Sequence, residues 1–80
     1  MIKLDARDLP SPEPFQIAVS ALSRLEVGEI IHFKHRMVPQ LLMPRLSEYY
    51  YKMIEGDEVD IYICHKDDET SIREIERLVR

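Results

Sequence analysis

The stretch from Leu4 to Pro14, Leu-Asp-Ala-Arg-Asp-Leu-Pro-Ser-Pro-Glu-Pro, most constrains how this chain folds. Apolar residues alternate at Ile2, Leu4 and Ala6, which predicts a strand that ends near Ala6. Apolar residues recur at helical spacing only after Ser11. The stretch is therefore predicted to join a strand to a helix through a short polar turn.

The start of that helix is marked by its residue types. Ser11 is predicted to be the N-cap, because its hydroxyl can accept a hydrogen bond from a free N–H of the first turn. Pro12 and Pro14 suit the first turn, where a missing proline donor breaks no helical bond. Glu13 and the preceding Asp8 place negative charge near the positive end of the helix dipole. We expect a rigid, polar helix entry.

The same stretch resembles the signature of TusA-like (SirA-like) sulfur-carrier proteins, Leu-Asp-x-x-Gly-x-x-Cys-Pro-x-Pro. The matching residues are Leu4, Asp5, Pro12 and Pro14. Asp8 stands where the family has glycine, and Ser11 stands where it has the persulfide-carrying cysteine. A serine hydroxyl cannot hold a persulfide. The resemblance thus implies the family fold without carrier activity at Ser11, as in a branch that lacks the carrier cysteine.

Alternating helical and strand patterns fill the chain up to residue 66. A helix over Pro12–Leu25 has an apolar stripe of Phe15, Ala18, Val19, Leu22 and Leu25. We then expect a strand over 29–35, a helix from about Val38 and a hairpin of strands 50–55 and 58–66. Pro44 is expected to kink that helix or to start a new turn in it. Gly56 is expected to supply a positive φ to the hairpin turn.

The element order βαβαββ predicts an α/β (α+β) two-layer sandwich, with two helices on one face of a four-stranded mixed sheet. The TusA-like resemblance implies the same arrangement over residues 1–66. The segment Pro39–Leu46 also loosely matches a Pro-x-x-Leu-x-Pro-x-Leu pattern of an uncharacterised TusA-like branch. We therefore expect a TusA-like domain over 1–66 and a C-terminal helical extension of that domain over 67–80.

The C-terminal extension carries its own helical pattern. Ser71 to Glu74 reads as a capping box. The apolar stripe that follows consists of Ile72, Ile75, Leu78 and Val79. The open face of the sheet, with Ile30, Tyr62 and Cys64, or a second subunit can bury this stripe. An oligomer contact or a packed edge is the alternative that we favour.

Composition excludes several classes of protein. The net charge of −4 argues against a general nucleic-acid binder. There is no apolar run near the ~18 residues that span a bilayer, and polar residues interrupt any signal-peptide core. The single cysteine excludes an internal disulfide, which fits a reducing compartment. We expect a cytoplasmic protein with no membrane association and no cofactor.

Ser11 and Cys64 are the two candidates for covalent chemistry. No Ser-His-Asp or Ser-Lys arrangement is recognisable around Ser11, so we interpret it as a cap. Cys64 is the only thiol. The TusA-like strand order implies that it lies near His32, whose imidazole would lower the pKa of the thiol. A covered sheet cysteine is the alternative, and we favour it.

Other clusters give weaker indications. His32 and His35 are spaced to point to opposite faces of a strand, so we expect no metal site with Met37, Cys64 or His65. The basic residues Lys34, His35, Arg36, Arg45 and Lys52 indicate either RNA binding or a solvated rim. Tyr49, Tyr50 and Tyr51 suit either a partner surface or simple strand formation.

The function that these patterns favour is a non-catalytic binding or adaptor module, in or derived from sulfur-transfer pathways, with a protein partner. Its expected contact residues are Asp5, Arg7, Asp8, Ser11, Pro12, Glu13 and Pro14. The first alternative is a sulfur-transfer or redox protein that uses Cys64. The second is RNA binding, by analogy of fold. A homo-oligomer through the C-terminal helix or the open sheet face is a further possible assembly.

Overall fold

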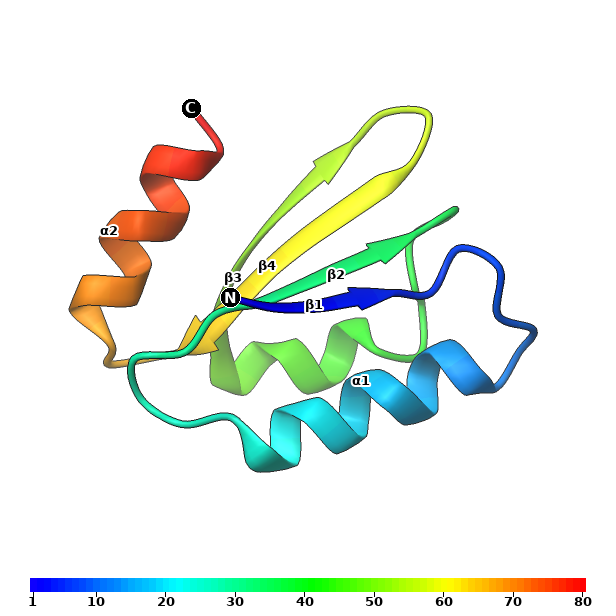
Figure 1. Cartoon of the computed structure of the whole chain (residues 1–80), viewed down its shortest axis with the longest axis horizontal. Coiled ribbons are helices and arrows are strands. Elements are labelled where there is room, and N and C mark those ends of the chain that lie inside the picture. The colour runs from blue at the N-terminus through cyan, green and yellow to red at the C-terminus, as the bar shows by residue number, and fades with distance from the viewer.

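A computed structural model describes residues 1–80, which form a four-stranded sheet with helices on both faces (Figure 1). The elements are β1 (Ile2–Asp5), α1 (Glu13–Arg24), β2 (Ile31–His35), the 3₁₀ helix η1 (Met43–Glu48), β3 (Tyr49–Glu55), β4 (Val59–His65) and α2 (Glu69–Leu78). The strand order is β1-β2-β4-β3. β1 and β2 are parallel, and the other neighbours are antiparallel. The predicted fold class is confirmed.

The main core lies between the sheet and the layer formed by α1 and η1 (Figure 1). Alternation along the central strands directs Ile31 and Phe33 of β2, and Ile61 and Ile63 of β4, into this core, where each is at most 1% exposed. The apolar stripe of α1 packs against them, with Leu22 buried. Hydrophobic burial on this face is the main stabilising contribution to the domain.

The C-terminal helix α2 packs on the opposite face of the sheet, at one end of it (Figure 1). Ile75 of α2, Ile30 and Cys64 form a second small core. Ile72 and Val79 pack against it, while Leu78 stays 42% exposed. The open sheet face therefore buries most of the α2 stripe within one chain, and the favoured oligomer contact is not needed for that purpose.

Both predicted helix caps are wrong. Pro12 occupies the N-cap position of α1, and no side chain caps this helix. Ser11 finds no donor, because the N–H of Glu13 donates to the carbonyl of Pro10 and Pro14 has no N–H. In α2 the N-cap is Asp68, whose carboxylate accepts from the backbone N–H of Ser71, so the capping box at Ser71 does not form.

The predicted second helix forms, but later in the chain and as a short 3₁₀ helix. The chain turns after Val38 and then forms only η1, a 3₁₀ helix with Pro44 in its first turn. Pro44 cannot donate the i→i−4 bond that an α-helix needs there. Only Leu46 of η1 is fully buried, so little apolar contact favours a longer helix.

The hairpin turn differs from the expected one as well. Gly56, Asp57 and Glu58 close the β3–β4 hairpin, because Glu55 pairs with Val59. Gly56 does not have a positive φ. Gly28 does, at +97°, in the turn that follows α1.

Candidate functional site

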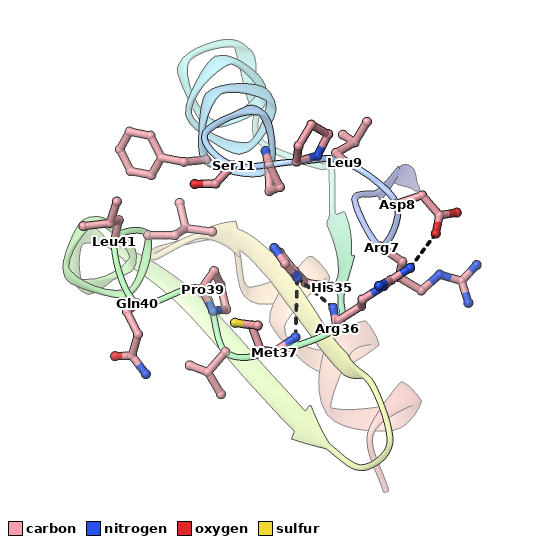
Figure 2. A pocket seen from close by; sticks show the side chains of 15 residues that line it. Arg7, Asp8, Leu9, Ser11, His35, Arg36, Met37, Pro39, Gln40 and Leu41 are labelled. Atoms are coloured by element: carbon pink, nitrogen blue, oxygen red, sulfur yellow. Dashed lines mark hydrogen bonds and ion pairs between the residues drawn. The ribbon is translucent and has the colours of Figure 1, made fainter.

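One pocket of about 540 Å³ lies beside the start of α1 (Figure 2). Residues 7–11 and 14–15 line one side, and residues 35–42 line the other. The first segment follows β1 and the second follows β2. Because β1 and β2 are parallel neighbours, the chain leaves both strands at the same edge of the sheet. The fold thus brings two loops together that are far apart in sequence.

Apolar side chains form most of the pocket walls. Of the residues that line it, Leu42 is fully buried, and Leu9 and Phe15 are half-buried. Met37 and Leu41 lie on the opposite loop and are 66% and 72% exposed (Figure 2). These are two of the most exposed large apolar side chains in the molecule. The pocket therefore offers uncovered apolar surface to a ligand.

The charged residues at the pocket are already paired within the chain. The guanidinium of Arg7 contacts the carboxylate of Asp5 at 2.6 Å and that of Glu58 at 3.0 Å. Hydrogen bonds from Arg7 lower the pKa of Asp5 to about 2. Arg36 contacts Asp8 at 2.9 Å, as Figure 2 shows. No uncompensated charge from these residues faces the pocket.

His35 lies between the two loops (Figure 2). Its Nδ1 accepts a hydrogen bond from the backbone N–H of Arg36 at 2.7 Å and a longer one from that of Met37 at 3.4 Å. Burial, with a smaller contribution from the charge of Arg36, lowers the pKa of His35. The neutral ring that these contacts need carries its proton on Nε2. Nε2 makes no hydrogen bond within the chain, so this N–H can donate to a ligand.

The structure brings part of the predicted contact set to this pocket. The lining residues from that set are Arg7, Asp8, Ser11 and Pro14. Asp5 does not line the pocket but forms an ion pair with Arg7, which does. Pro12 and Glu13 are exposed outside the pocket. The wall formed by residues 35–42 was not predicted from the sequence. The signal for it was the parallel β1–β2 pair, which places the two following loops side by side.

Cys64 is not part of this pocket. It is fully buried under α2, and burial raises the pKa of its thiol to about 11. The favoured prediction of a covered sheet cysteine is confirmed, and His32 makes its contacts with other residues, because the register places Tyr62 opposite it. The His32 ring stacks on Tyr62 at 4.4 Å, and its Nε2 bonds Asp60 at 2.7 Å.

The remaining candidates have structural contacts. Among the basic residues, Lys34 pairs with Asp60 at 3.2 Å, and Arg45 and Lys52 lie over the rings of Phe15 and Tyr50. Tyr49 and Tyr51 pack on the main core, and Tyr50 packs on the small core beneath α2. No group of three or more His, Cys, Asp or Glu side chains is arranged to hold a metal ion. None of the helices has the length and apolar character needed to cross a bilayer.

Comparisons with protein-family models, with curated proteins and with solved structures gave no match for this chain. The TusA-like resemblance therefore stays a prediction that depends on residues 4–14.

Proposed function

We propose that this domain is a non-catalytic binding module that holds an uncharged, apolar segment of a partner protein in the pocket beside α1. The observation that carries the proposal is the exposure of Met37 and Leu41 over an apolar wall. Such surface is unfavourable in water and is stabilised when a partner covers it. We keep the TusA-like descent and a cytoplasmic location as parts of this proposal.

The ion pairs at the pocket favour an uncharged ligand. A charged ligand group would have to compete with Asp5 and Glu58 for Arg7, or with Asp8 for Arg36. Each exchange loses an existing pair and gains one of similar strength, so it adds little affinity. An apolar side chain gains burial without that exchange.

Two unused polar groups suit the backbone of an extended segment. The Nε2–H of His35 and the hydroxyl of Ser11 both lie at the pocket, and neither has a hydrogen-bond partner within the chain. Each can donate to a carbonyl oxygen of a bound peptide. The volume of about 540 Å³ falls in the range of sites that enclose a small ligand or a few side chains.

The site geometry gives less support to the alternative functions. No hydrogen bond joins the Ser11 hydroxyl to a base that would activate it for nucleophilic attack. A buried Cys64 with a pKa of about 11 is a poor sulfur carrier at neutral pH. RNA binding needs free cations, whereas Lys34 and Arg36 are paired with acidic groups.

The test is an NMR titration of the ¹⁵N-labelled chain with end-capped synthetic peptides of eight residues. One peptide is apolar and uncharged, and two others carry Asp or Lys at a central position. We expect the apolar peptide to shift amide signals of residues 9–15 and 36–42 and the charged ones to bind more weakly. Shifts confined to α2, or equal binding of all three peptides, contradict the proposal.

A matched pair of variants sharpens this test. Leu41→Asp places a charge on the exposed pocket wall, and Leu78→Asp places one on an exposed apolar residue of α2. The first is expected to weaken peptide binding by roughly tenfold or more, and the second to leave it unchanged. Because both side chains are exposed, neither change is expected to unfold the domain.

A further inference from the structure

We propose that the chain forms a symmetric dimer through the outer edge of β3, so that the sheet of one protomer continues into that of its partner. β3 ends the sheet, with β4 as its only neighbour (Figure 1). The occupant of this edge is a second copy of the chain. Three features favour this pairing: the free backbone groups of β3, its weak edge protection and the register of self-pairing.

The register identifies which backbone groups face outward. The N–H of Gly56 donates to the carbonyl of Glu58, so the strand residues of β3 with even numbers bond to β4. The N–H and C=O groups of Tyr51, Met53 and Glu55 therefore point away from the sheet. No backbone hydrogen bond outside the sheet takes up the N–H groups of Tyr51 and Met53. This edge is a free template for another strand.

β3 has few of the features that usually protect a sheet edge. It runs for seven residues, contains no proline, and has Lys52 as its single basic residue. The other edge strand, β1, has only four residues and carries both Lys3 and Asp5. β3 is also apolar in composition, with three tyrosines, Met53 and Ile54. Of the two edges, only β3 combines length, apolar character and low charge.

The antiparallel register centred on Met53 suits self-pairing of β3. When Met53 lies opposite the partner's Met53, Tyr51 lies opposite the partner's Glu55 and their outward N–H and C=O groups exchange hydrogen bonds. Lys52 then lies opposite the partner's Ile54. Centring the pairing on Lys52 instead would place two ammonium groups directly opposite each other, which is unfavourable. Charge therefore disfavours the Lys52-centred register. The register centred on Met53 is the one that pairs the outward-facing Tyr51, Met53 and Glu55 of both protomers with one another.

This dimer is compatible with the proposed binding pocket. The pocket lies where the chain leaves β1 and β2, and β3 is on the far side of β4 from these two strands. Each protomer would thus keep its pocket open, and the dimer would carry two of them. Two linked pockets bind a partner with repeated segments more tightly than one pocket does.

The first test measures the mass of the chain in solution by sedimentation velocity over a range of concentrations. We expect a monomer–dimer equilibrium that Met53→Pro shifts by roughly tenfold or more toward monomer. Proline removes an outward N–H and leaves the β4 pairing intact, since edge strands tolerate it there. Met53→Ala keeps the N–H and should still dimerise. A chain that is monomeric at all concentrations, or a Met53→Pro variant that dimerises normally while folded, overturns the proposal.

The second test reads the register through disulfide trapping. Met53→Cys places two thiols opposite each other, and mild oxidation should yield a covalent dimer rapidly. Glu55→Cys is the matched control, because in this register the two substituted positions lie roughly 13 Å apart along the strands, too far for a disulfide. The native Cys64 is buried and does not interfere. Equal trapping of both variants rules out this register.

Discussion

The buried carboxylate of Asp68 links the turn after α1 to the start of α2 through Gly28. Its Oδ2 accepts the backbone N–H of Gly28 at 2.7 Å, and its Oδ1 accepts the N–H of Ser71 at 3.2 Å. Gly28 adopts a φ of +97°, which other residue types rarely adopt. A single side chain thus caps α2 and fixes the turn that leads into β2.

Asp68 is expected to make the stability of the domain depend on pH in the acidic range. Its hydrogen bonds, from Ser71 first and then from Gly28, lower the pKa of this carboxyl below its ordinary 3.8. The stabilisation is present above pH 3.8 and is lost as the pH falls through the lowered pKa. Asp68→Ala should lower the thermal midpoint at pH 7 and flatten this acid dependence. Glu69→Ala, one residue further and exposed, is the control and should behave like the parent chain.

Cys64 is expected to react slowly with thiol reagents in the native protein. Burial first, and then the charge of Asp68, raise its pKa from 9.0 to about 11. Labelling of the native chain near neutral pH should be much slower than labelling in urea.

The unfolded Cys64 thiol ionises at lower pH than the folded one, so the stability of the domain should also fall between pH 9 and 11. Fast native labelling near pH 7, with a persulfide adduct after incubation with a sulfur donor, would favour the sulfur-transfer alternative.

Ile75 is expected to anchor α2 to the sheet. It is fully buried against Ile30 and Cys64. Ile75→Ala should lower the free energy of unfolding by about 2–4 kcal/mol, from lost burial and the cavity that is left. Leu78→Ala, on the same helix but 42% exposed, should change it far less. Urea denaturation of both variants measures the difference, and similar losses would show that α2 packs differently.

His35 is expected to make stability fall on mild acidification. Burial, with the charge of Arg36, lowers its pKa below the ordinary 6.5, so the unfolded chain takes up this proton first. Stability is therefore complete above pH 6.5 and decreases as the pH falls toward the lowered pKa. His35→Asn keeps an acceptor for the N–H groups of Arg36 and Met37 but does not titrate. The variant should show a smaller change in stability between pH 7 and 5, and an unchanged slope would contradict this role.

The alternation of apolar and polar residues was sufficient to predict most of the sheet. The buried faces of β2 and β4 follow directly from Ile31 and Phe33, and from Ile61 and Ile63, because each pair is two residues apart on a strand. Competition for hydrogen bonds was not visible in the sequence. Ser11 has the side chain of a cap, yet the Pro10 carbonyl takes the N–H of Glu13 that the hydroxyl would need.

Only one of the two sides of the pocket was predicted from the sequence. The 7–15 side was marked by local turn chemistry, whereas the 35–42 side depends on the long-range pairing of β1 with β2. The position of α2 does not follow from the sequence for a similar reason. Its stripe shows that Ile75 must be buried, but not whether the sheet or another chain buries it.

The small core under α2 is separate from the main core on the other face of the sheet. α2 can therefore detach while the main core stays closed, as a local unfolding event with its own free energy. Because Ile75 and its helix cover Cys64, only such an event exposes the thiol short of global unfolding. The rate at which Cys64 becomes modified in the folded protein thus measures how often the C-terminal helix leaves the sheet.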